Sequence, residues 1–317
     1  MGSDVSEWCE ARVPEEWGGE RLDRFLSEYL ALCNRSQLKS RGVETTVNGE
    51  EARLSRKLHP GELVRALLPP LQPTHLDPEE IDLPILYEDD QVIVVNKPQG
   101  LIVHPGAGNP GGTLANALVY HSLELQTSFQ EESEERPGIV HRLDKETSGV
   151  IITAKNPEAL ATLAREFKRR TTEKRYVALL RGTPPRSEGI VEGYIRRDPR
   201  NRKRFVWSPV EGKEAITGYK VLRHLPSGYT LVRFEPKTGR THQLRVHAAH
   251  LHAPILGDPV YSRRDQRFPN ARMMLHAFSL RIRLPGEEEP RLFRAPLPPR
   301  FRSIVRSLRD DHLRETP

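Results

Sequence analysis

The sequence has very few cysteines. Only Cys9 and Cys33 occur among the 317 residues, and two cysteines without ligand spacing exclude a zinc finger and a disulfide framework. Such sparse use of cysteine is typical of a reducing compartment, so we expect a cytoplasmic protein.

Long apolar runs are missing as well. No stretch has the length that a helix needs to cross a bilayer, and the first thirty residues contain no signal-peptide core, so we expect no membrane partner. Acidic residues are fewer than basic ones, and the formal net charge is +6 with a pI near 9.4. This balance favours a polyanionic partner, although many basic proteins bind no nucleic acid.

Residues 138–149 combine reactive side chains with turn-forming residues, and a β-rich run lies on either side. Side chains alternate along an extended segment, so Arg142 and Asp144 should share one face while His141 and Leu143 point the other way. The pattern predicts a cation beside an anion at the rim of a sheet. The alternative is a surface hairpin with a weak ion pair, which we disfavour because other segments supply partners for Asp144.

The first part of the chain has the pattern of a small domain over residues 11–68, preceded by a flexible segment, 1–10. Apolar positions recur at helical spacing over 21–32, and a short basic helix should follow over 35–41. The pair Asn48-Gly49 predicts a hairpin turn.

Three cations lie on or beside this basic helix and could contact phosphates of a nucleic acid: Arg35, Lys39 and Arg41. The alternative is a solvated helix face. Residues 69–80 contain four prolines, which predicts a stiff linker between two domains.

A larger domain should occupy residues 81–300, with a basic tail over 301–317. Asn156-Pro157 predicts a helix start, because Asn caps helices and Pro suits their first position. Residues 173–180 have the pattern of a strand in which Lys174 and Tyr176 share a face.

Residues 106–111 satisfy the G-x-G-x-x-G pattern of nucleotide-binding folds. We disfavour that function because Pro110 falls where a backbone amide should face a phosphate, and no βαβ crossover follows. The segment is better interpreted as a glycine-rich loop leading into a helix over 114–120.

The densest basic run covers residues 196–204, and we expect Arg200, Arg202 and Arg204 to contact an RNA backbone. The alternative is a solvated loop, but so many like charges repel one another without an anionic partner.

A third motif lies at residues 237–247. Gly239 should end a strand, Thr241 can cap a helix, and Arg245 would lie one turn inside that helix, where a buried cation needs an anion. Asp144 is a natural candidate for that anion. A metal cluster of His242, His247, His250 and His252 is disfavoured, because no pair at i, i+4 has an accompanying acidic base.

The segment His141-Arg-Leu-Asp144, followed by Thr147-Ser-Gly149, resembles the central motif of the RluA/RluD family of pseudouridine synthases, which isomerise uridine in structured RNA. Asn96-Lys-Pro98, the Lys-x-Tyr pattern at 174–176 and the motif at 237–247 are also similar to the family. The N-terminal pattern resembles the alpha-L RNA-binding fold of a small-subunit ribosomal protein. The fold class we predict is α+β, with this small domain before a catalytic domain that has a mixed, mostly antiparallel sheet flanked by helices.

The resemblance also implies roles. Asp144 would be the catalytic residue and Arg245 its ion partner; Tyr176 would pack on the target base, and Leu244 would belong to the apolar wall. Arg142 would occupy the gap left by the flipped nucleotide. The implied substrate is large-subunit ribosomal RNA or its assembly intermediate. We further expect a monomer.

Converting uridine to pseudouridine breaks the bond from N1 to the ribose, rotates the base and joins C5 to C1′. No electrons are exchanged, so we expect neither cofactor nor metal; one placed carboxylate acts as nucleophile or proton acceptor. The sequence leaves open whether Asp144 attacks the sugar, attacks the base or abstracts a ribose proton. Two alternatives remain, a non-catalytic RNA-binding or ribosome-assembly factor and an RNA N-glycosidase.

Overall fold

The computed structural model describes residues 8–33, 35, 38, 42–69, 76–106, 108–122, 125, 138–201 and 203–315. The chain divides into two compact units, residues 1–74 and 75–317. Their boundary falls inside the range 69–80 that we assigned to a linker. Each unit has its own core, and each is described separately.

The first unit contains a four-stranded antiparallel sheet in the order β1-β4-β2-β3. Its strands are β1 (Trp8–Arg12), β2 (Glu44–Val47), β3 (Glu50–Glu51) and β4 (Leu63–Leu67). The helical segments are η1 (Glu15–Trp17), α1 (Leu22–Arg24) and η2 (Phe25–Tyr29). Leu22, Phe25 and Leu26 pack against Val47 and Val64 of the sheet, so the predicted apolar stripe does form the core.

The structure bears on four predictions for this unit. Residues 1–10 were predicted to be flexible, but residues 8–10 belong to β1, which pairs with β4 along its whole length. The helix predicted over 21–32 ends at Tyr29, after a π-helical turn. Asn48 and Gly49 do form the hairpin turn between β2 and β3, both with positive φ (53° and 83°), as a tight turn of that kind requires. Most of the basic helix predicted over 35–41 lies outside the described residues.

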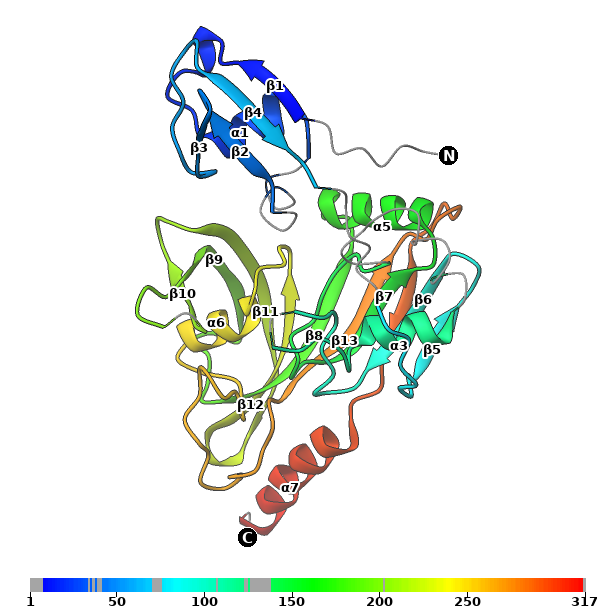
Figure 1. Cartoon of the computed structure of the whole chain (residues 1–317). Coiled ribbons are helices and arrows are strands. Elements are labelled where there is room, and N and C mark those ends of the chain that lie inside the picture. The colour runs from blue at the N-terminus through cyan, green and yellow to red at the C-terminus, as the bar shows by residue number, and fades with distance from the viewer. Residues whose placement is uncertain are drawn as a thin grey trace. The chain divides into compact units, whose positions relative to one another are not determined.

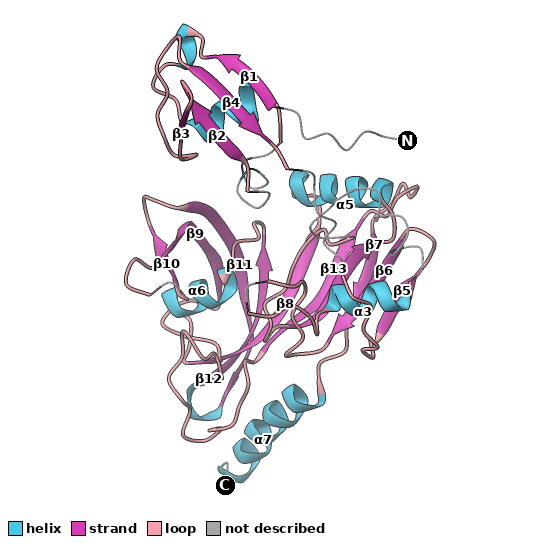
Figure 2. Ribbon diagram, viewed as in Figure 1, coloured by secondary structure: helices cyan, strands magenta, loops and turns pink. Residues whose placement is uncertain are grey.

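The second unit is built on one ten-stranded sheet in the order β10-β9-β11-β12-β8-β13-β7-β6-β5, with β14 pairing to β13 (Figures 1 and 2). All pairs are antiparallel except β13 with β7, which confirms the mixed, mostly antiparallel sheet. The strands are β5 (Ile85–Glu88), β6 (Val92–Lys97), β7 (Ser148–Ala154), β8 (Glu173–Arg181), β9 (Glu188–Arg197), β10 (Phe205–Ser208), β11 (Lys213–Leu225), β12 (Tyr229–Pro236), β13 (Leu275–Ile282) and β14 (Arg291–Arg294).

The strands β6 and β7 are buried on both faces, which explains their almost continuous apolar sequences. On one face Val94 and Ile152 pack with Leu163 of α5 (Pro157–Arg169). On the other face Ile93 and Ile151 pack with the helix α3 (Leu114–His121). The predicted start of α5 is confirmed, because the Asn156 side chain accepts a hydrogen bond from the backbone N–H of Ala159 (2.9 Å).

The other half of the sheet packs against the helices α6 (Gln243–His250) and α7 (Pro299–Glu315), with the short helix η3 (Pro226–Gly228) between β11 and β12. Residues 301–317 were predicted as a basic tail, but α7 covers most of this range. Phe301 and Leu308, seven residues apart, are fully buried in the same core as β12. Two anchors on one helix face are enough to dock a segment that is otherwise rich in arginine.

Residues at the end of the predicted linker belong to the second unit. The Glu79 side chain accepts a hydrogen bond from the Gly112 N–H (2.8 Å), and the Asn116 side-chain amide donates to the Asp77 carbonyl (2.9 Å). In the part of the chain that the structure describes, no helix is both long enough and apolar enough to cross a membrane.

Candidate active site

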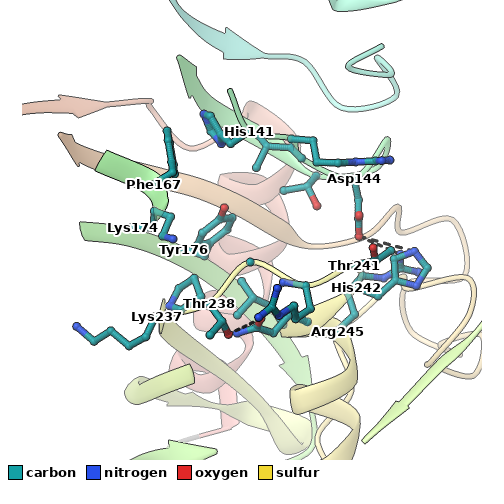
Figure 3. A pocket seen from close by; sticks show the side chains of 18 of the residues that line it. His141, Asp144, Phe167, Lys174, Tyr176, Lys237, Thr238, Thr241, His242 and Arg245 are labelled. Atoms are coloured by element: carbon teal, nitrogen blue, oxygen red, sulfur yellow. Dashed lines mark hydrogen bonds and ion pairs between the residues drawn. The ribbon is translucent and has the colours of Figure 1, made fainter. Parts of the chain in front are cut away.

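A pocket of about 510 Å³ opens in the second unit, and segments far apart in the sequence line it. Its walls come from the loop 140–147, the end of α5, the start of β8, the loop after β12 and the first turn of α6. All five predicted active-site residues line this pocket, and Arg142 is the exposed one among them. Figure 3 shows Lys174 and Tyr176 on one side of the pocket and Asp144 with Arg245 on the other.

The loop that carries Asp144 has a regular strand only on its C-terminal side, although a β-rich run lies on either side in the sequence. Ile139 makes only an isolated bridge to Thr153, and the strand β7 begins four residues after Asp144. Gly138 turns the chain at φ 68°, where a Cβ atom would come within 2.3 Å of the Ala154 carbonyl oxygen. Burial follows the predicted alternation at three of these positions, because Leu143 is buried in the core while Arg142 is exposed and Asp144 is half-buried.

Lys97, at the end of β6, anchors the backbone of this loop. The side chain is fully buried, and its Nζ donates to three backbone carbonyls at 2.7 to 3.3 Å, those of Leu101, Pro98 and Lys145. Burial lowers the pKa of Lys97 to about 7. The anchored carbonyl of Lys145 directly follows Asp144, so the loop position is fixed by backbone as well as by side chains.

Arg245 contacts Asp144 as predicted, with 3.1 Å between Nη1 and Oδ2. The sequence reasoning missed a second partner. Asp258 accepts from Arg245 Nε (2.6 Å) and Nη2 (2.9 Å), and its side chain is completely buried. Burial acts to lower the pKa of Arg245, but the hydrogen bonds and charge of Asp258, followed by the charge of Asp144, outweigh it and raise that pKa. The guanidinium therefore stays charged.

The opposite wall carries Tyr176 and Lys174 on the same face of β8, as the alternation predicted. Burial, together with the charge of Asp144, raises the pKa of the Tyr176 hydroxyl, so the ring is neutral. Burial lowers the pKa of Lys174, and Lys237 and Arg170 lower it further. Leu244 is 7% exposed and adds apolar surface to the pocket beside Arg245.

The start of α6 differs from the prediction that Thr241 caps it. The N-cap residue is His242, in a left-handed conformation with φ 59°. The Gln243 side chain anchors the turn instead, because its Oε1 accepts from the backbone N–H of Arg240 (2.9 Å) and its Nε2 donates to the Ile216 carbonyl (3.0 Å). One signal for this geometry is present in the sequence, because histidine tolerates left-handed backbone better than most residues.

Of the predicted RNA-binding residues in the second unit, Arg200 and Arg204 are described, and neither lines the pocket. Arg200 and Arg204 are exposed in the turn between β9 and β10, which the Asp198 side chain stabilises by accepting from the Arg200 N–H (2.9 Å). Arg35 of the first unit is ion-paired with Asp23 at 2.7 Å and remains half exposed. Lys39, Arg41 and Arg202 lie outside the described residues.

The histidines that could have formed a metal site are separated by the fold. His242 faces the pocket, His247 is fully buried, and His250 stacks on Trp207 at 4.0 Å between ring centres. Among the residues that the structure describes, no three His, Cys, Asp or Glu side chains are grouped so that they could hold a metal ion.

A sequence profile described as RNA pseudouridylate synthase matches residues 91–250 of this chain. The chain is also 43% identical over 287 residues to the ribosomal large subunit pseudouridine synthase D of Borreliella burgdorferi, across 89% of this chain and 87% of that protein. The chain belongs to the RNA pseudouridylate synthase family. The resemblance seen in the sequence motifs is therefore confirmed, and the protein is an RNA pseudouridine synthase.

Other members of the family agree in length and fold. An uncharacterized RNA pseudouridine synthase of Aquifex aeolicus is 42% identical over 311 residues, which cover 95% of this chain and 96% of that protein. The solved structure of human RNA pseudouridylate synthase domain containing 4 is 28% identical, with a TM-score of 0.55 over 71% of this chain and 92% of that one. The range matched by the family profile contains Asp144, Tyr176 and Arg245 but ends before Asp258.

Proposed function

We propose that this synthase isomerises specific uridines in large-subunit ribosomal RNA and that Asp144 is its catalytic group. The observation that carries the proposal is a single carboxylate, fixed by Arg245 at 3.1 Å, in a pocket whose opposite wall presents Tyr176. The relatives named ribosomal large subunit pseudouridine synthase D support the choice of RNA.

The two oxygens of Asp144 have different surroundings. Oδ2 accepts from Arg245, whereas Oδ1 receives no hydrogen bond from any residue that the structure describes. A carboxylate held at one oxygen keeps its orientation and presents the other to the substrate. Oδ1 would therefore act at the nucleotide, either as nucleophile or as acceptor of a ribose proton.

The target uracil must be flipped out of its stacked position in the RNA before it can react. Tyr176 offers a neutral ring on which a flipped pyrimidine can stack, and Leu244 adds an apolar surface that keeps water from the detached base. Arg142 is exposed beside Asp144 and makes no ion pair with a described residue, so it is free to fill the place of the flipped nucleotide.

RNA binding would extend beyond the pocket. The exposed arginines at Arg200 and Arg204 would contact phosphates, and the first unit, with Arg35, Lys39 and Arg41, would add a second contact area and so raise affinity. The enzyme would act as a cytoplasmic monomer without metal or cofactor, since the isomerisation exchanges no electrons.

One observation weighs against an RNA N-glycosidase. Glycosidases generally use two carboxyl groups on either side of the scissile bond. Among the described residues that line the pocket, Asp144 is the only acidic one. A purely RNA-binding role is equally disfavoured, because it gives no reason for the Asp144–Arg245–Asp258 array.

The test is to incubate large-subunit ribosomal RNA with the purified protein and to detect pseudouridine at base resolution. We expect a few uridines to be converted with the RNA chain intact. Abasic sites in their place would favour the glycosidase, and unmodified RNA that remains tightly bound would favour the assembly factor.

A further inference from the structure

His242 lies beside the carboxylate of Asp144, which is the proposed catalytic group. Its Nε2 is 4.0 Å from Asp144 Oδ2, the oxygen that Arg245 contacts, and its side chain is only 17% exposed. Figure 3 shows the imidazole next to Arg245 on the Asp144 side of the pocket.

The backbone of His242 is held in an unusual conformation. Its φ of 59° and ψ of 16° are left-handed, and this residue is the one directly before α6 begins. Left-handed backbone is uncommon for a residue with a side chain and persists only where the surroundings enforce it. The conformation places the ring between the carboxylate of Asp144 and the hydroxyl of Tyr261.

The Tyr261 hydroxyl links the backbone of Phe205 to the imidazole of His242. The backbone N–H of Phe205 donates to the Tyr261 hydroxyl oxygen (2.9 Å), and that oxygen is 3.0 Å from His242 Nδ1. With one lone pair of the oxygen occupied, the hydroxyl hydrogen is available for Nδ1. The imidazole proton then resides on Nε2, toward Asp144.

The opposite tautomer is electrostatically unfavourable. It would turn the lone pair of Nε2 toward the negative oxygen of Asp144, 4.0 Å away. Burial lowers the pKa of His242, although the charge of Asp144 partly opposes this, so a neutral ring is the form to consider near pH 7. Hydrogen bonding and charge therefore select the same tautomer.

We propose that Tyr261 fixes His242 as the Nε2–H tautomer and that this N–H, together with Arg245, positions the Asp144 carboxylate during isomerisation. The inference rests on the proposed role of Asp144 and makes His242 a positioning residue. A movement of Asp144 by about 1 Å would bring Nε2–H within hydrogen-bond range. The Nε2–H of His242 can therefore remain hydrogen-bonded to Asp144 while the negative charge of that carboxylate decreases during the reaction and is restored at its end.

The activity test compares two substitutions of the full-length protein, His242→Gln and His242→Met. Both side chains are unbranched and similar in length, so the left-handed backbone costs both about the same, but only Gln retains a donor near the position of Nε2. We expect His242→Met to lower the single-turnover rate at saturating RNA by about 10- to 100-fold, because small displacements of a catalytic group have effects of this size. His242→Gln should recover a large part of the loss, and both should bind RNA like the wild type.

The tautomer is measured separately, by ¹⁵N NMR of the histidine-labelled protein, with His242→Gln identifying the signal. We expect the wild type to show the proton on Nε2 and Tyr261→Phe, which keeps the ring but loses the hydroxyl, to show mixed tautomers. A proton on Nδ1 in the wild type, or equal rates for His242→Met and the wild type, would overturn the proposal. A wild type that forms no pseudouridine would instead overturn the proposed function and the positioning role with it.

Discussion

Asp258 holds two of the three guanidinium nitrogens of Arg245, and only the third is left for Asp144. The two inner hydrogen bonds measure 2.6 and 2.9 Å, and the outer one measures 3.1 Å. Asp258 is itself fixed, because its Oδ1 accepts from the backbone N–H groups of Val260 (2.8 Å) and Tyr261 (3.0 Å). The plane of the guanidinium is thus set before it reaches Asp144, the proposed catalytic group, which is preorganisation of the kind that catalysis requires.

Asp258→Asn should therefore damage both stability and rate. The amide presents a donor to one of the Arg245 N–H groups and removes the buried one of the two carboxylates that hold the guanidinium. We expect a loss of about 2–4 kcal/mol in the free energy of unfolding, because removing one partner of a buried pair is costly. Urea unfolding measures this loss, and single-turnover kinetics should show a slower reaction at saturating RNA. The control is Asp310→Asn on the exposed side of α7; an equal effect there would contradict the assignment.

Removing positive charge from the turn between β9 and β10 should weaken RNA binding without changing the rate of isomerisation at saturating RNA. Arg200→Gln with Arg204→Gln removes two exposed charges, so the slope of log K against log salt should fall by about two. Filter binding over a range of salt concentrations measures this slope. Arg302→Gln with Arg306→Gln, two exposed arginines of α7, provides a charge-matched comparison. If the slope does not change in the turn variant, the turn faces solvent or another protein.

His141 should make the protein sensitive to acid. Its ring stacks on Phe167 at 4.6 Å, and its Nε2 accepts a hydrogen bond from the Ile152 N–H (3.1 Å), so it must be neutral. Burial, with the charge of Lys174 adding to it, lowers the pKa of His141 from 6.5 to about 3. Between these values the unfolded chain binds a proton that the folded chain does not. Stability is therefore intact above pH 6.5 and falls below it, by about 1.4 kcal/mol per pH unit for this group.

The measurement is the free energy of urea unfolding between pH 7 and pH 5. His141→Gln keeps an acceptor near the position of Nε2 but does not titrate, so its stability should decline less steeply. The exposed His224→Gln is the control and should follow the wild type. Parallel curves for all three proteins would show that His141 is not the sensitive group.

Removing the first unit should impair recognition of full-length RNA but leave the isomerisation activity of the second unit. Because residues 75–317 form a compact unit with its own core, a chain that begins at residue 75 should fold alone. It should modify a short stem-loop at high concentration, yet lose much of its activity or site choice on full-length ribosomal RNA at low concentration. Equal activity and selectivity on both substrates would mean that the first unit serves something other than substrate recognition.

Local patterns allowed much of this structure to be predicted. The cap at Asn156, the turn at Asn48-Gly49 and the alternation of Lys174 and Tyr176 depend on neighbours in sequence, so the residues themselves carry the signal. The contact of Arg245 with Asp144 was predictable because a buried cation needs an anion, and a family motif suggested which one.

The rest depends on distant partners. Asp258 follows a glycine and precedes a proline, which is the pattern of an ordinary turn, and nothing local shows that its carboxylate is buried under Arg245. The left-handed backbone of His242 is one that histidine tolerates, but nothing local shows that its ring contacts Phe205 and Tyr261, which are distant in sequence. The docking of α7 through Phe301 and Leu308 could not be predicted, because the surrounding arginines make the segment look like a basic tail.

The central claim is that Asp144 performs the isomerisation, and Asp144→Asn tests it most directly. Asparagine is nearly the same size and can still accept from Arg245, so folding and RNA affinity should change little. With purified wild type and variant at equal occupancy of ribosomal RNA, base-resolved detection of pseudouridine should show conversion by the wild type and none above background by Asp144→Asn. Turnover by the variant beyond a trace would contradict the account, since the reaction would then need another catalytic group.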